Sequence, residues 1–227
     1  MQLFLLLFLF ALIGTLWGRS RFLKIYGQES ANHLSSKITG AELAEAILKR
    51  CGIGGIAIVK GRGVVPDTYD PGQRRLSLAP QHFGGTTFPA LAFAALEAGK
   101  AIQHFEGHRP LLWRNAAVRA SLFLSPALLF LGIVTLVLGM TKTLFPLVVL
   151  AWSLVAFWNF LTIPTEIDAG LRVKRVLDEM RIFRNLDERI GVERVIGAAS
   201  TAHIDGLSLV LSWASLTFLP RSRGKED

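Results

Sequence analysis

Two apolar segments, residues 121–140 and 143–164, are separated only by Thr141 and Lys142. Each is close to the roughly 20 residues with which an apolar helix crosses the hydrocarbon layer of a membrane. Because the connection is so short, the two helices must be antiparallel, and the chain returns to the side from which it entered. We therefore expect a transmembrane hairpin over residues 119–164, which places Glu166 on the same side of the membrane as residues 19–118.

The N-terminal residues 1–18 are almost continuously apolar, and Arg19, Arg21 and Lys24 follow them directly. The segment lacks the basic start and the small-residue cleavage site of a secretory signal, so we interpret it as a retained transmembrane anchor. The positive-inside rule then places the N-terminus outside and the following domain in the cytoplasm. The sequence predicts a multi-pass protein of the cell membrane.

The composition fits this interpretation, with 51% apolar residues and a net charge of +8. The basic residues lie next to apolar segments, where they set topology and meet anionic lipid headgroups. No nucleic-acid-binding motif is present, so the lipid bilayer, and not nucleic acid, is the expected partner of this charge. Cys51 is the only cysteine, which excludes an intrachain disulfide and a metal site of clustered thiolates.

Residues 19–118 carry the pattern of a small α+β domain. Residues 25–38 are polar and resemble a linker, and Thr39 with Glu42 forms a capping box that opens an amphipathic helix ending near Cys51. Short strands are expected at 55–60 and 75–79, joined through the turn residues Tyr69-Asp70-Pro71-Gly72. The predicted fold class is a mainly α-helical integral membrane protein with a small α+β extramembrane domain.

Beyond the hairpin, residues 165–194 contain a charged helix that Glu166 and Asp168 open, which is where acidic side chains favour a helix. Residues 195–219 predict a fourth apolar helix, followed by a basic tail at 220–227. His203 and Asp205 are costly at membrane depth. They indicate either a functional intramembrane pair or a hydrogen bond satisfied inside the helix bundle.

The segment Leu96-Glu97-Ala98-Gly99-Lys100 lies in a predicted helix that Pro89 could begin and that Gly107 and Pro110 close. In a His-Glu-x-x-His helix, two histidines one turn apart bind zinc, and the glutamate polarises the metal-bound water. Here Glu97 occupies the position of that base, while Leu96 and Lys100 occupy the ligand positions. At helical spacing Glu97, Lys100 and His104 share one face.

The flanking sequence resembles the membrane-bound neutral zinc metallopeptidases of the YugP-like type, in order and spacing, from about residue 37 to residue 205. The motifs that carry this resemblance are Thr39-Gly40-Ala41-Glu42-Leu43-Ala44, Asp67-Thr68-Tyr69-Asp70-Pro71, Gly99-Lys100-Ala101-Ile102-Gln103-His104 and Ile163-Pro164-Thr165-Glu166. The resemblance implies a membrane protease fold with a zincin-like signature helix, a zinc ion and hydrolysis of peptide bonds. It assigns Glu166 to the third metal ligand, and it places Thr68 where active relatives often have histidine.

The ligand positions depart from that pattern. Leu96 offers no ligand atom, and protonated Lys100 puts a positive charge where the metal would be, so we expect no metal cofactor. Instead, a buried Lys100 could separate Glu97 from Glu166 in an ion-pair network. An alternative is a rearranged zinc site that uses His104 and Glu97.

These observations lead to one hypothesis with two competitors. We expect a catalytically inactive member of the peptidase family, a pseudopeptidase that acts by binding a protein partner or a substrate. The partner could be another copy of this chain or a related, active membrane protein. The first competitor is an active membrane peptidase with a non-standard zinc site and Glu97 as general base, and the second is a structural membrane assembly subunit. Nothing in the sequence indicates an organic cofactor.

Overall fold

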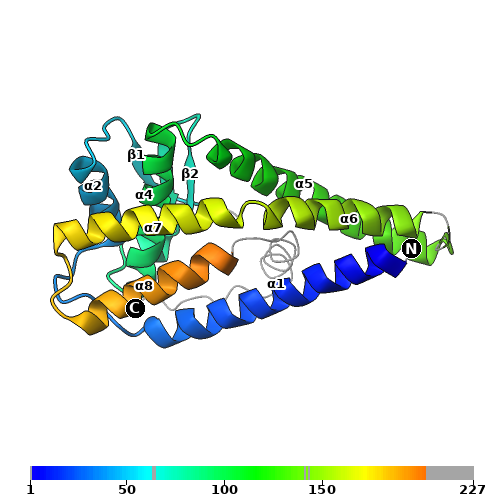
Figure 1. The fold of residues 1–227 in the computed structure, drawn as a ribbon, viewed down its shortest axis with the longest axis horizontal. Coiled ribbons are helices and arrows are strands. Elements are labelled where there is room, and N and C mark those ends of the chain that lie inside the picture. The colour runs from blue at the N-terminus through cyan, green and yellow to red at the C-terminus, as the bar shows by residue number, and fades with distance from the viewer. Residues whose placement is uncertain (1, 63–64, 141, 143, 203–227) are drawn as a thin grey trace, which may run out of the picture.

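The computed structural model describes residues 2–62, 65–140, 142 and 144–202 (Figure 1). Its helices are α1 (Gln2–Glu29), α2 (Gly40–Arg50), α3 (Pro80–Phe83), α4 (Phe88–Phe105), α5 (Pro110–Val137), α6 (Phe145–Phe160), α7 (Ile163–Met180) and α8 (Leu186–Ala202). Its strands are β1 (Ala57–Lys60), β2 (Thr68–Asp70) and β3 (Arg75–Leu78). The predicted combination of many helices with a small sheet is confirmed.

Helix α4 lies at the centre of the domain, where α2, α7, α8 and the sheet contact it. The Thr87 hydroxyl accepts the backbone N–H of Ala90 and caps the start of the helix. Pro89 lies in the first turn, where a missing N–H breaks no helical hydrogen bond. Every residue from Phe88 to Gln103 is buried. The helix ends at Phe105, and Gly107 follows in a left-handed conformation with φ of 73°.

The sheet has the order β1-β3-β2, with β1 parallel to β3 and β2 antiparallel to it. The strands predicted at 55–60 and 75–79 and the capping box at Thr39 are confirmed. Strand β2 is a correction, because the sequence predicted a turn from Tyr69 onward. The turn begins one residue later, where Asp70 Oδ1 accepts the backbone N–H of Gly72 at 2.8 Å, while Tyr69 is buried and pairs with Leu76.

Helix α1 is one continuous helix to Glu29, so the prediction of a linker from residue 25 is wrong for its first five residues. Phe22, Ile25 and Tyr26 pack against the domain core, which keeps this polar stretch helical. The helix contacts α8 and α6. Its N-terminal end lies at the same end of the molecule as the turn between α5 and α6 (Figure 1).

Helices α5 and α6 pack against each other as a hairpin. In the described part of the chain, α5 is the helix long and apolar enough to cross a membrane, and α6 is apolar but shorter. Helix α6 stops at Phe160 instead of continuing to residue 164. Pro164, in the first turn of α7, has no N–H to donate back to Phe160, so the helix breaks there and α7 begins at Ile163.

The charged helix predicted within residues 165–194 is α7, which ends at Met180, and the remainder of that segment forms a short connection and the start of α8. Arg181 has a left-handed conformation with φ of 51° and ends α7. The Asn185 side chain then accepts the backbone N–H of Glu188 at 2.8 Å and opens α8. The predicted helix at 195–219 therefore starts inside α8. Residues 203–227, with His203, Asp205 and the tail at 220–227, lie outside the described residues.

Candidate functional site

Helices α4 and α7 cross at Gly99, where their backbones approach closely. A Cβ atom on Gly99 would lie 2.5 Å from the carbonyl oxygen of Ala169. The next residue of α7, Gly170, faces α8 instead, because a Cβ atom there would lie 3.1 Å from Ile196 and 3.2 Å from Ser200. This crossing brings one face of α4, including Leu96, Lys100 and Gln103, against α7.

Four charged side chains meet beside the crossing, and we call them the charge quartet: Glu97, Lys100, Arg114 and Glu166. Lys100 Nζ lies 2.7 Å from Glu97 Oε1 and 3.2 Å from Glu166 Oε2. Arg114 Nε donates a short hydrogen bond to Glu166 Oε1. The side chains come from α4, α5 and α7, so the quartet joins three helices.

The quartet is closed to solvent. The exposed fractions of Glu97, Lys100, Arg114 and Glu166 are 0%, 1%, 3% and 2%. Two carboxylates and two cations sum to zero charge, which makes their joint burial tolerable, since an uncompensated buried charge is costly. Glu97 Oε2 is buried and has no hydrogen-bond partner among the described residues.

Arg114 is the member of the quartet that sequence reasoning missed. It lies in the second turn of α5, between Arg109 and Arg119, and basic residues before an apolar run are typical of a membrane boundary. Its guanidinium also donates from Nη1 to Asn115 Oδ1 at 3.0 Å. Its partner Glu166 is 52 residues away in the sequence. No local spacing rule could have paired them.

A second polar group extends the contact between α4 and α7. The buried Gln103 donates from Nε2 to the carbonyl oxygen of Thr165 at 2.9 Å and to Asp168 Oδ2 at 2.7 Å. Arg172 Nε donates to the same Asp168 oxygen at 2.6 Å, and its Nη1 pairs with Glu106. These bonds fix the first turns of α7, and with them the backbone that carries Glu166.

His104 lies away from the quartet. The Tyr69 hydroxyl and His104 Nδ1 are 2.8 Å apart, which ties β2 to the end of α4. Seven residues separate His104 from Glu97, about 10.5 Å along a helix axis. Thr68 lies at the start of β2 and pairs with Ser77 of β3. The structure thus joins Glu97, Lys100 and Glu166 and leaves His104 bound to Tyr69.

The aspartate of the Asp67-Thr68-Tyr69-Asp70-Pro71 motif belongs to a separate buried chain of hydrogen bonds. Asp67 Oδ2 lies 2.9 Å from His82 Nδ1, and His82 Nε2 lies 3.0 Å from the Tyr26 hydroxyl. Burial, and secondarily the negative charge of Asp67, raises the pKa of Tyr26. Asp67 Oδ1 also accepts the backbone N–H of Ala79 at 2.8 Å. These hydrogen bonds connect α1 to the domain.

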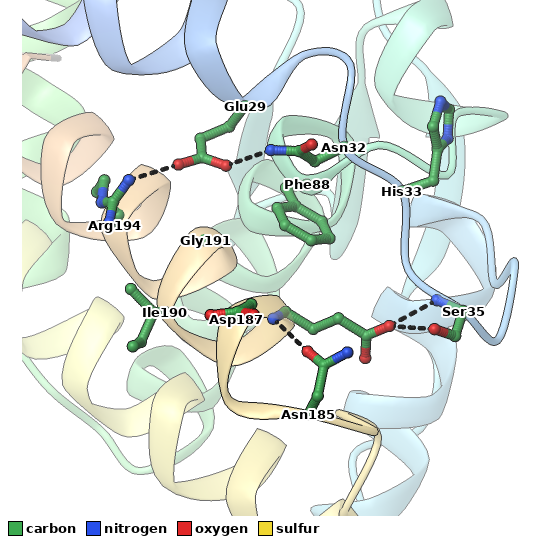
Figure 2. Close-up of a pocket in the computed structure, with 11 residues that line it drawn as sticks. Glu29, Asn32, His33, Ser35, Phe88, Asn185, Asp187, Ile190, Gly191 and Arg194 are labelled. Carbon is green, nitrogen blue, oxygen red and sulfur yellow. Dashed lines mark hydrogen bonds and ion pairs between the residues drawn. The ribbon is translucent and has the colours of Figure 1, made fainter.

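An open pocket of about 460 Å³ lies where the end of α1, the start of α4 and the start of α8 meet (Figure 2). Glu29 there accepts bonds from Asn32 and Arg194, each at 2.8 Å, and Phe88 packs over Gly191. Phe88 precedes Glu97 by nine residues, about 13.5 Å along the helix axis. The pocket is therefore distinct from the quartet.

The described residues offer no ready set of metal ligands. No group of three or more histidine, cysteine, aspartate or glutamate side chains among them lies in an arrangement that could hold a metal ion. In the quartet, the two carboxylates of Glu97 and Glu166 face cations and not other ligand groups.

Comparison with known proteins agrees with the motifs of the sequence. The family model described as "Putative neutral zinc metallopeptidase" matches residues 4–219. The chain is also similar to the protein named "Putative membrane protease YugP" of Bacillus subtilis (strain 168), with 31% identity over 205 residues that cover 89% of each chain. No solved structure matches this chain.

Proposed function

Because the chain belongs to the neutral zinc metallopeptidase family, we propose that it is a non-catalytic member, a pseudopeptidase of the membrane that acts by binding a protein partner or a substrate segment. The observation that carries the proposal is the place of Lys100 Nζ. It lies between Glu97 and Glu166, where a His-Glu-x-x-His helix would hold its metal.

The residues at this site do not fit a zinc ion. A catalytic zinc site uses three protein ligands and an open position for water. Leu96 has no donor atom, and Lys100 has a cationic head in contact with both carboxylates. Glu166 is then the one family ligand position that still carries a ligand group, and its two oxygens face Lys100 and Arg114.

The quartet supports a structural role for these inherited positions. Two carboxylates that share a buried site repel each other unless a cation separates them. Lys100 and Arg114 together supply two positive charges, the same total that a zinc ion would bring. The burial of all four side chains also argues against catalysis, because a peptide bond cannot reach Glu97 while the helices are packed as they are.

The membrane arrangement belongs to the same proposal. Helix α5 is long and apolar enough to span a bilayer, and the relative is named a membrane protease. We place α5, α6 and the part of α1 up to residue 18 in the membrane, with the rest of α1, the α+β domain and α7 on the cytoplasmic side. Arg19, Arg21 and Lys24 on the domain side favour this orientation.

A binding role is supported by apolar side chains that stay exposed on the domain. Outside the candidate span, Phe105, Ile167, Leu171, Leu186 and Ile190 are exposed large apolar residues. Ile167 and Leu171 lie four residues apart on α7, as do Leu186 and Ile190 on α8, so each pair shares one helix face. These two apolar faces are where we propose that a protein partner binds. A related membrane peptidase with intact zinc ligands, or a second copy of this chain, is the partner that we propose.

The test is the zinc content of the detergent-solubilised full chain, compared with a Leu96→His/Lys100→His variant by elemental analysis. We expect the wild type to be zinc-free and the variant to hold about one equivalent. Stoichiometric zinc in the wild type that Glu166→Ala releases would contradict the proposal and favour an active peptidase. A variant that folds but stays zinc-free would show that the assumed ligand geometry is wrong.

A further inference from the structure

We infer that Arg114 is a positioning residue, which holds one carboxylate oxygen of Glu166 so that the other faces the position of Lys100. The contact itself is independent of the proposed function. Its meaning for metal binding rests on that function, because only then is the Lys100 position a former ligand position.

The two oxygens of Glu166 have different partners. Oε1 accepts from Arg114 Nε, and Oε2 lies 3.2 Å from Lys100 Nζ. The guanidinium is itself held, because its Nη1 donates to Asn115 Oδ1 at 3.0 Å. A planar guanidinium whose N–H groups donate to two different partners cannot rotate freely, so it orients the carboxylate that it binds. An ammonium acts more as a point charge. Arg114 therefore determines which way the Glu166 carboxylate is turned.

Arg114 also connects the site to the candidate membrane helix. It belongs to α5, while Glu166 belongs to α7 and Lys100 to α4. It is 3% exposed, so the contact lies inside the packing and not at the lipid or water surface. Without Arg114, the charges of Glu97, Lys100 and Glu166 would sum to −1 at a site that is closed to solvent. The burial of Glu166 as a carboxylate thus depends on a residue of the span.

One consequence concerns any cation at the Lys100 position. Because Oε1 is occupied, Oε2 is the oxygen that Glu166 offers to that cation. In this chain the cation is the Lys100 ammonium. In a variant with histidine at 96 and 100, the same oxygen would be offered to zinc, and removal of Arg114 would release the carboxylate to turn. Groups that orient a metal ligand typically contribute 10- to 100-fold in affinity.

The first experiment measures thermal unfolding of the solubilised full chain for Arg114→Met, Glu166→Gln and the double variant. Each single change leaves the quartet with one unbalanced charge, whereas the double change leaves only Glu97 with Lys100. We expect the double variant to unfold at a higher temperature than either single variant, and to be folded even if a single variant is not. Arg119→Met is the control, because Arg119 lies on the same helix but is exposed. Additive losses would overturn the inference.

The second experiment measures zinc affinity in the Leu96→His/Lys100→His background, with Arg114 intact, as Arg114→Lys and as Arg114→Met. We expect affinity to fall by about 10-fold or more with methionine and by less with lysine. Equal affinities in folded proteins would overturn the inference while the proposed function stands. If the background variant takes up no zinc, the proposed ligand geometry fails, and the unfolding experiment alone decides whether Arg114 positions Glu166.

Discussion

At the scale of single residues, the buried lysine of this molecule depends on its carboxylate partners, because an uncompensated buried charge is costly. Lys100 is 1% exposed, and its ammonium has two carboxylate partners. Replacing it with methionine keeps the volume but leaves two carboxylates with only Arg114. We expect Lys100→Met to destabilise the protein by about 3–5 kcal/mol, the usual cost of breaking a buried ion pair. The measurement is thermal or denaturant unfolding in detergent.

The matched control for this prediction restores the balance of charge. Lys100→Met/Glu97→Gln leaves Glu166 with Arg114 and removes the second carboxylate. We expect the double variant to recover a large part of the lost stability. If Lys100→Met unfolds like the wild type, the contacts of Lys100 with Glu97 and Glu166 add no stability, and the quartet does not act as an ion-pair network.

Some of the charged residues of this site could be predicted from the sequence, and others could not. The contact of Glu97 with Lys100 follows from helical spacing, because residues three apart share a face. Glu166 could be placed only through the family resemblance, and Arg114 not at all, since its partner is distant in sequence and a basic residue at an apolar boundary has a simpler explanation. Long-range pairing of charges depends on how helices pack, which local patterns do not contain.

At the scale of elements, the crossing of α4 and α7 depends on the absence of a side chain at Gly99. A Cβ there would lie 2.5 Å from the Ala169 carbonyl oxygen, and backbone cannot easily give way. We expect Gly99→Ala to destabilise the fold by about 1–3 kcal/mol, as overpacking does. Gly197→Ala in α8 is the control, because no described residue lies within 4 Å of its added Cβ. There, alanine should be neutral or stabilising by up to about 1 kcal/mol. Similar unfolding temperatures for the two variants would contradict a close crossing.

The start of α8 carries a carboxylate whose ionisation stabilises the fold. Glu188 accepts the backbone N–H of Ser35 at 2.9 Å, the Ser35 hydroxyl, and the backbone N–H of Arg184 at 2.8 Å. Burial acts to raise the pKa of Glu188. Together these hydrogen bonds lower it by more than burial raises it, so the pKa is below its ordinary value. A group with a lowered pKa stabilises the fold above its unfolded pKa, and this contribution is lost as pH falls through the folded value.

We therefore expect Glu188→Gln to be less stable than the wild type at pH 7 by about 1–3 kcal/mol, the range for hydrogen bonds to a buried charged group. The difference should shrink as pH falls below about 4.3, the ordinary pKa of glutamate, toward the lower pKa of the folded state. Unfolding temperatures measured between pH 7 and 3 test this expectation. A difference that is independent of pH would mean that Glu188 acts only through its shape.

Element boundaries show where sequence patterns stop being informative. The capping box at Thr39 and strands β1 and β3 follow local rules and were predicted. The end of α7 at Arg181 was not, because a charged residue in a left-handed conformation has no sequence signal comparable to glycine. Strand β2 was missed because its three residues run directly into turn residues.

At the scale of the whole molecule, the antiparallel hairpin places the domain and the α5–α6 turn at opposite ends. The N-terminal end of α1 lies at the same end as that turn (Figure 1). The short connection at Thr141-Lys142 predicted that the two helices of the hairpin are antiparallel. The packing of α1 along α8 and α6 could not be predicted, because it depends on which faces meet across the whole length of the chain.

The proposed orientation has a direct test, since Cys51 is the only cysteine and lies in the domain, half-buried at the end of α2. Lys142 is exposed at the hairpin turn, so Lys142→Cys in a Cys51→Ser background reports on the opposite end. Burial, then the nearby Glu179, raises the pKa of the Cys51 thiol, so labelling with a membrane-impermeant maleimide is best done at mildly alkaline pH.

In intact cells we expect the maleimide to label the cysteine introduced at position 142 and to leave Cys51 of the wild type unlabelled. After permeabilisation both positions should be labelled, because the membrane no longer protects the domain. The reverse pattern in intact cells would invert the topology. Equal accessibility of both positions in intact cells would mean that the hairpin does not cross the membrane, and the positive charges at Arg19, Arg21 and Lys24 would then need another explanation.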